Sequence, residues 1–237
     1  MESNYTTYQV NSFKEYQDII LNISDEQFIL YRGQPIDKPL LPKIARYSLE
    51  DVESVEREML AEFQRRSLYL LESHPGNLWD WLALAQHHGM ATRLLDWSEN
   101  PLIALWFSMS ILPETTPDYS VVWGFHAPKR DVIQSDKAVD PFKSRATKIF
   151  KPNHIIKRIS AQFAWFTIHH HNKDNKFIPF EDNTEYSGKL FKIKVDKHCF
   201  PECKRRLHHF GINSEIMYPD IDGLAKHMEW LFLGKKD

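Results

Sequence analysis

The sequence predicts one α+β domain over residues 1–237, in which helices flank a mixed, mostly antiparallel sheet. Two observations favour this fold class. Several segments carry apolar residues at helical spacing, and shorter apolar runs between turn residues are typical of strands. No internal repeat and no linker rich in Gly, Ser or Pro divides the chain, so one domain is the simplest interpretation.

The N-terminal half predicts a strand followed by two helices. Residues 28–33 form a short apolar run that ends in glycine, which is typical of a buried strand with Arg32 near its end. A long amphipathic helix is expected to begin at Ser48, a candidate N-cap. The next helix covers residues 78–88 and ends at Gly89, because glycine readily adopts the left-handed conformation that closes many helices.

The middle of the chain predicts a third helix and two strands. Asn100 can cap this helix, and Pro101 can take its first position. The buried helix continues through residues 102–112. Apolar patterning predicts strands over residues 120–127 and 188–195, the second with outward-facing lysines.

The remaining segments are less regular. Residues 128–187 show no single periodicity and receive no assignment. Residues 198–211 predict a short helix closed by Gly211. The last segment, residues 216–231, is expected to turn at Pro219 and Gly223 and to end in a final helix.

The composition is that of a folded protein. Hydrophobic residues make up 42% of the chain and aromatic residues 13%, which excludes an intrinsically disordered protein. The formal net charge of −2 gives no overall attraction to nucleic acid or anionic lipid. Any contact with nucleic acid would therefore need a local basic patch.

The sequence indicates a cytoplasmic protein without membrane contact. It contains no run of about 18 apolar residues, and its N-terminal segment lacks the features of a signal peptide. Cys199 and Cys203 are the only cysteines, too few for a disulfide framework. We therefore expect both thiols to be reduced.

Arg32 is the first candidate site residue. Its planar guanidinium group matches the geometry of phosphate and carboxylate. The alternative is a structural ion pair with a carboxylate such as Asp96 or Asp220, because buried charges are usually paired. Arg93 lies three residues before Asp96 and could pair with the same carboxylate.

Gln86, His87 and His88 lie at the expected end of a helix. A histidine titrates near neutral pH and can transfer protons. Adjacent helical residues point about 100° apart, so at most one of the two histidines faces a given pocket. We take His88 as the candidate catalytic histidine.

Other chemical signatures are weak. The histidines of segment 169–171 and the Cys and His residues of segment 198–209 do not match the spacing of structural zinc sites, and we expect no metal. The sequence contains no P-loop and no GxGxxG, GxSxG or HExxH motif. Triphosphate hydrolysis, a Rossmann site, the hydrolase elbow and the zincin helix therefore lack their markers.

Six motifs, taken in order, resemble those of one family. They are YRGQ at 31–34, LLPKIAR at 40–46, AEF at 61–63, LALAQHHGMATRLLDWSENPLIALWFS at 82–108, AQFAWF at 161–166 and FGINSEIMYPDIDGLA at 210–225. Through them the chain resembles the FRG-domain proteins, whose name denotes a Phe/Tyr-Arg-Gly triplet, here Tyr31, Arg32 and Gly33. Ser98 and Ser108 replace the usual threonine and alanine. The resemblance covers nearly the whole chain and implies a single FRG domain over residues 1–237.

The resemblance also implies a chemistry by analogy. A strand-end Tyr-Arg-Gly, a later polar and aromatic corner, and a carboxylate near the C-terminus are similar to the layout of ADP-ribosyltransferases. This similarity implies an ADP-ribosyltransferase-like fold and NAD as the substrate. Such chemistry needs a cation for the pyrophosphate, aromatic faces for nicotinamide, and a carboxylate to stabilise the positive charge of the breaking glycosidic bond.

The analogy assigns roles to residues of this sequence. Arg32 fits the cation, and Tyr31 or Trp97 fits the aromatic face. The residues expected to bind NAD are Tyr31, Arg32, Gly33, Gln86, Arg93, Asp96 and Trp97.

The candidate catalytic residues are Arg32, His88 and a carboxylate. Glu215 ranks first among the carboxylates because it precedes an expected strand at 216–218, and Asp220 and Asp96 are the alternatives. The sequence departs from the transferase pattern, since it has no ExE or QxE pair and no Ser-Thr-Ser after a strand.

We therefore expect an NAD-consuming, ADP-ribosyltransferase-like effector that modifies a macromolecular acceptor, either protein or nucleic acid. The resemblance implies a role as a toxin or an anti-phage defence component. The sequence leaves open whether an antitoxin or another regulatory partner chain holds it inactive.

Two other functions remain open from the residues. One is a module that binds or processes nucleic acid, with His87 or His88 for acid–base chemistry and the basic residues 204–206 for phosphate. The other is a non-catalytic interaction domain in which the arginines and aspartates only form ion pairs. In that case, Arg32→Ala and Asp96→Ala would unfold the protein.

Overall fold

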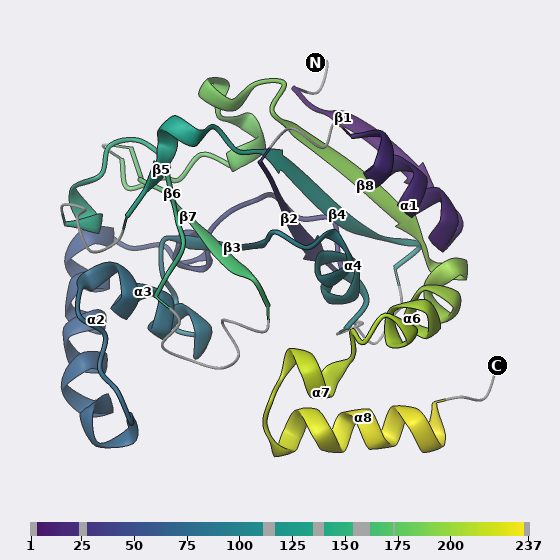
Figure 1. Cartoon of the computed structure of the whole chain (residues 1–237). Coiled ribbons are helices and arrows are strands. Elements are labelled where there is room, and N and C mark those ends of the chain that lie inside the picture. Colours follow the sequence, from purple (N-terminus) through teal and green to yellow (C-terminus); the bar gives the residue numbers. More distant parts are fainter. Residues whose placement is uncertain are drawn as a thin grey trace.

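The computed structural model describes residues 4–23, 28–110, 117–134, 140–153, 162–172 and 174–234. A sheet of eight strands in the order β1-β8-β4-β2-β3-β7-β6-β5 lies at its centre (Figure 1). The strands are β1 Thr6–Val10, β2 Ile29–Gln34, β3 Leu94–Ser98, β4 Tyr119–His126, β5 Val132–Ile133, β6 Lys148–Phe150, β7 Ala164–Ile168 and β8 Leu190–Asp196.

The pairing of these strands confirms the mixed, mostly antiparallel sheet. β1 runs parallel to β8, and β5 runs parallel to β6. The other neighbouring pairs among the described strands are antiparallel. Among the described strands, β1 and β5 form the two edges, so the sheet is open.

Helices flank the sheet as predicted. The described α-helices are α1 Phe13–Asn22, α2 Val52–Ser67, α3 Leu78–His87, α4 Pro101–Ser110, α6 Phe200–His209, α7 Ser214–Met217 and α8 Ile221–Leu233. In Figure 1, α2 and α3 lie beside β3 and β7, whereas α1, α4 and α6 lie beside β8, β4 and β2. None of the helices in the described segments is long and apolar enough to cross a membrane.

Three apolar clusters hold these layers together. One lies between α1, α4, α6 and the sheet and contains Tyr31, Leu105 and Ile193. A second lies between α2, α3 and the β3–β7–β6 part of the sheet. The third covers the opposite sheet face, where Phe125 meets Phe180 at 4.9 Å between ring centroids. Burial of each large apolar side chain contributes about 1.5–3 kcal/mol to folding.

Polar caps fix the helix boundaries near the site. Asp51 begins α2 by accepting a hydrogen bond from the Ser54 N–H at 2.9 Å, so the helix starts later than the predicted Ser48. Asn100 accepts from the Leu102 N–H at 2.9 Å and begins α4, as predicted. Gly89, with φ of +83°, follows α3 in the expected left-handed conformation.

Three sequence expectations are wrong. Gly223 does not mark a turn, because it lies in the first turn of α8 and its N–H donates to the Asp220 cap at 2.8 Å. Residues 216–218 do not form a strand, because Asn213 accepts a hydrogen bond from the Ile216 N–H at 3.1 Å and begins the helix α7. Lys192 on β8 does not face outward: it is 7% exposed, pairs with Asp37 at 2.8 Å, and lies 4.4 Å from the centroid of the Trp123 ring. The strand itself is present, over Leu190–Asp196.

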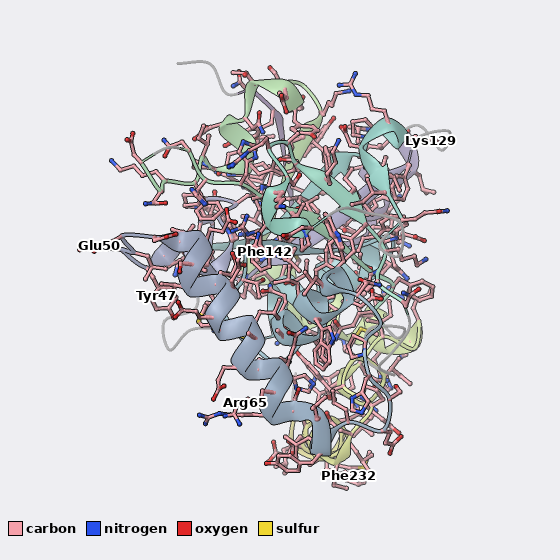
Figure 2. The ribbon with its side chains drawn as sticks, turned by 90° about the vertical axis from the view of Figure 1, so that its left-hand side faces the viewer. Tyr47, Glu50, Arg65, Lys129, Phe142 and Phe232 are labelled. Carbon is pink, nitrogen blue, oxygen red and sulfur yellow. The ribbon has the colours of Figure 1, made fainter. Side chains whose placement is uncertain are left out.

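The described residues of the unassigned region 128–187 form three strands, β5, β6 and β7, together with short 3-10 turns. One turn places Phe142 against the outer helix α2, and Figure 2 shows this ring beside the helix. The guanidinium carbon of Arg57 on α2 lies 4.3 Å from the Phe142 ring centroid. These strands and turns thus complete the part of the sheet that carries α2 and α3.

Candidate functional site

A cavity of about 290 Å³ lies where β2 and β3 diverge, between the end of α3 and the helix α4. Within the described residues, β2 and β3 pair only at Tyr31 and Ser98, whereas β2 pairs with β4 along its whole length. We call this space the Arg32 cavity. Its walls are formed by Tyr31, Arg32, Gly33, Pro35, Gln86, His87, Asp96, Trp97, Ser98, Ala104, Phe107, Ser110, Gln162, Ala164, Phe166 and Tyr218.

Arg32 joins the two diverging strands. Its Nη1 donates to the main-chain oxygen of Asp96 at 2.7 Å and to the Asp96 carboxylate at 3.1 Å. The Asp96 carbonyl group lies on the edge of β3, at a position where β2 and β3 no longer pair through their backbones. The Arg32 side chain satisfies this carbonyl group instead. The sequence had left open a pair with Asp96 or Asp220, and the structure shows Asp96.

Asp96 is also held from the other side. Gln86 Nε2 donates to Asp96 Oδ1 at 2.8 Å, and the Thr92 hydroxyl donates to Gln86 Oε1 at 2.6 Å. The carboxylate side chain is 51% exposed, against 17% for Arg32. A carboxylate can accept about four hydrogen bonds, so Asp96 keeps acceptor capacity toward a ligand.

The two adjacent histidines point in different directions, as expected for neighbouring residues at the end of a helix. His87 lines the Arg32 cavity, whereas His88 is exposed and lies outside the lining. The two rings lie 5.1 Å apart, with an angle of 88° between their planes. The structure therefore brings His87, and not the candidate His88, to the cavity.

Gly33 has a structural explanation that does not need a ligand. A Cβ atom built on it would lie 2.0 Å from the Ala104 carbonyl oxygen and 2.5 Å from the Ser108 nitrogen. Only glycine allows the backbone of α4 to approach β2 this closely. Gly33 also borders the cavity. The close contact between Gly33 and α4 therefore sets the position of the cavity wall that α4 forms.

Tyr31 and Trp97 border the cavity with largely buried rings. Tyr31 is 6% exposed and Trp97 is 3% exposed. The Trp97 indole N–H donates to the Thr167 hydroxyl at 2.9 Å, which fixes the ring in the sheet. Phe107 and Tyr218 are half-buried and offer more aromatic surface to a ligand.

Arg93 is not brought to the Arg32 cavity and does not pair with Asp96. Its backbone N–H and its Nε both donate to Glu56 on α2 at 2.7 Å, and the two side chains are 1% and 0% exposed. Arg93 therefore connects β3 to α2. Burial raises the pKa of Glu56, although the charge and hydrogen bonds of Arg93 oppose this shift.

The C-terminal carboxylates also lie outside the Arg32 cavity. Glu215 is on α7, with its carboxylate 3.8 Å from Nε2 of His227. Asp220 caps α8 by accepting from the Gly223 N–H at 2.8 Å. Asp96 is the carboxylate that lines the cavity.

The histidine and cysteine clusters lie outside the lining of the Arg32 cavity. His169 is buried with Nε2 2.8 Å from the Thr167 hydroxyl, and burial lowers the pKa of this histidine to about 3. Cys199 and Cys203 are buried free thiols. In the described segments, no group of three or more His, Cys, Asp or Glu side chains is arranged to hold a metal ion.

Residues 27–115 match the family model of the FRG domain. Over this range the chain is similar to FRG domains. The matched range runs through β2, α2, α3, β3 and α4. The chain matches no curated protein and no solved structure.

The matched range supplies most of the Arg32 cavity, including Arg32, Gln86, Asp96 and Phe107. The motifs at 161–166 and 210–225 lie beyond the matched range. An FRG domain that extends over residues 1–237 therefore stays a prediction.

Two further cavity residues, which were not among the candidate site residues, come from these later motifs; one of them, Tyr218, lies in the MYPD turn that the sequence placed in the same cleft. Gln162 donates through Nε2 to the Met217 oxygen at 3.0 Å and accepts from the Ser98 hydroxyl at 2.8 Å through its main-chain oxygen. Gln162 thus links Ser98 on β3 to Met217 on α7. Tyr218 follows α7 and lies 6.4 Å from Phe107 between ring centroids. The motifs AQFAWF and MYPD were the available signals.

Proposed function

We propose that the Arg32 cavity binds NAD and that the protein breaks the bond between nicotinamide and ribose, transferring ADP-ribose to a protein or nucleic-acid acceptor. The observation that carries this proposal is the cluster of Arg32, Asp96 and Gln86 in a cavity with aromatic walls. A cation, a carboxylate and aromatic faces are the three groups that this chemistry requires.

Each group has a role in the reaction. Phe107 and Tyr218 hold the nicotinamide ring, and Arg32 supplies the positive charge for the phosphate next to the ribose that reacts. As the glycosidic bond breaks, nicotinamide leaves with the bonding electrons and positive charge develops on the ribose. Asp96 stabilises that charge, and it takes the place expected for Glu215.

The acceptor then completes the transfer. A nucleophilic oxygen or nitrogen of the acceptor forms the new bond to the ribose carbon and releases a proton. His87 lines the cavity and is placed to receive this proton, the role expected for His88.

The proposed cellular role rests on the resemblance to FRG-domain proteins. The protein acts as a toxin or an anti-phage defence component in the cytoplasm. An antitoxin or regulatory partner chain would control it by covering the Arg32 cavity.

The test is release of nicotinamide from NAD by the purified protein, alone and with cellular protein or RNA as acceptors. Asp96→Asn and Arg32→Lys should lower the rate by about 10²–10³, the usual effect of removing one transition-state contact. Glu215→Gln is the control outside the cavity and should keep the wild-type rate. Absence of nicotinamide release with any acceptor, or full activity in folded Asp96→Asn, contradicts the proposal.

A further inference from the structure

A second cavity of about 430 Å³ adjoins the Arg32 cavity. It lies between α4, α6, α7 and α8, and the two cavities share Ser110 and Tyr218 in their walls. The Tyr218 ring contacts Phe107, which lines the Arg32 cavity, and lies 5.7 Å from Trp106, which lines the second cavity. Tyr218 is therefore the partition between them. We call the second space the Lys204 cavity.

The lining of the Lys204 cavity is positively charged. It contains Lys204 on α6 and Lys226 on α8, and no Asp or Glu of the described chain lines it. Neither lysine forms an ion pair with a described residue, whereas Arg206 on the same helix pairs with Glu202. Burial lowers the pKa of Lys204, with no carboxylate to oppose the shift. An anion in this cavity would stabilise both ammonium groups.

An acidic group beside the cavity is not part of its lining. Glu215 lies 3.8 Å from Nε2 of His227, which is itself a lining residue. The Glu215 side chain is 48% exposed and is absent from the lining. The chain as a whole carries a formal charge of −2, so this positive cavity is a local feature.

Aromatic rings form the rest of the lining. Trp106, Tyr218 and Trp230 provide flat apolar surface, and the Trp230 ring lies 4.8 Å from the ring of His208. Planar rings of this kind hold a planar heterocycle by stacking. Cationic groups beside aromatic walls are the combination that suits an aromatic ligand with a phosphate group.

The two cavities differ in charge balance. In the Arg32 cavity the arginine is matched by Asp96, whereas the lysines of the Lys204 cavity have no such partner. The Arg32 cavity alone lies at the lower limit of the volumes that hold small ligands, which is about 300 Å³. A ligand with two ring systems joined by phosphates would use both spaces.

We infer that the Lys204 cavity binds a nucleoside 5′-phosphate group, with its base between the aromatic rings and its phosphate at Lys204 and Lys226. This inference rests on the proposed function to the extent that the group is the adenylate half of NAD. The nicotinamide half then occupies the Arg32 cavity, and the phosphate linkage passes Tyr218.

Calorimetric binding of adenosine monophosphate, nicotinamide mononucleotide and NAD tests the inference. Lys204→Met and Lys226→Met keep the apolar stem and remove the charge, so each should weaken adenosine monophosphate binding by about tenfold or more. Nicotinamide mononucleotide binding should remain unchanged. Arg205→Met removes one charge from an exposed position of the same helix and should leave all three affinities unchanged.

The outcomes separate the inference from the proposed function. If adenosine monophosphate does not bind, or binds equally to folded Lys204→Met and Lys226→Met, the inference is overturned. Cleavage of NAD with an unchanged KM in these variants overturns the inference and leaves the proposed function intact. If adenosine monophosphate binds through the lysines and no nicotinamide is released from NAD, the nucleotide site stands and the proposed function is wrong.

Discussion

Arg93 and Glu56 form an almost fully buried ion pair that connects β3 to α2. Both the backbone N–H and Nε of Arg93 donate to the Glu56 carboxylate at 2.7 Å. The Arg93 guanidinium also lies 4.8 Å from the centroid of the Phe142 ring. The QHHGMATRLLDW corner therefore has two separate parts, because Arg93 is structural and Asp96 faces the cavity.

Loss of one partner of this pair should strongly destabilise the protein. Arg93→Ala leaves the Glu56 carboxylate buried without its partner, and such losses cost about 3–5 kcal/mol. Urea denaturation followed by circular dichroism measures this change. Arg66→Ala is the control, because Arg66 pairs with Glu62 on an exposed surface and should change stability by less than about 1 kcal/mol. Equal stabilities of the two variants would contradict the assigned role of Arg93.

The sequence predicted the fold class and most of the elements near the site. Apolar periodicity, the Asn100 cap and Gly89 placed β2, α3 and α4 correctly because these signals are local. The elements of region 128–187 were not predicted, because local signals do not mark them. Its strands are short, and β6 takes its register from pairing with β5 and β7, so no local pattern marks it.

The partner of Arg93 was missed although a signal existed. Val52, Glu56 and Leu60 lie at helical spacing on the buried side of α2, so Glu56 is an acidic residue on an apolar helix face. A charge at such a position requires a partner. The divergence of β2 and β3, which creates the Arg32 cavity, depends on backbone geometry that side-chain patterns do not report.

Substitution of Gly33 should destabilise the contact between β2 and α4. In Gly33→Ala the added methyl group would overlap the Ala104 carbonyl oxygen, 2.0 Å away, and overpacking of this kind costs about 1–3 kcal/mol or more. Thermal unfolding should show a lower Tm. Gly76→Ala is the matched control, because its added Cβ meets no atom within 4 Å. Identical melting of both variants would rule out the close approach of α4 to Gly33.

Acid should destabilise the protein partly through His169. Burial lowers the pKa of His169 to about 3, whereas the ordinary value is 6.5. Between these values the unfolded chain binds a proton at this residue and the folded chain does not. The contribution to stability is therefore complete above about pH 6.5 and falls by up to about 1.4 kcal/mol per unit as the pH decreases toward 3.

The variant His169→Gln isolates this effect because it removes the titrating group and keeps a hydrogen-bonding side chain near Thr167. Its free energy of unfolding, measured between pH 4 and pH 7, should depend less on pH than that of the wild type. His74→Gln changes an exposed histidine and should retain the wild-type dependence. An unchanged pH dependence in His169→Gln would show that His169 is not held neutral by burial.

Arg32→Ala distinguishes a ligand-binding role from a purely structural one. The Arg32–Asp96 pair is partly exposed, so loss of its ionic contribution costs about 0–1 kcal/mol, and loss of the bond to the Asp96 carbonyl adds about 0.5–1.5 kcal/mol. We expect the variant to fold and to lose NAD binding.

A non-catalytic interaction domain instead predicts that Arg32→Ala unfolds. The midpoint of urea denaturation and the affinity for NAD are therefore measured on the same sample. Arg57→Ala removes a partly exposed arginine of α2 that pairs with Glu53 and Asp140, and this variant should keep NAD binding. If Arg32→Ala unfolds, or if it folds and binds NAD as the wild type does, the role of Arg32 in the cavity is structural.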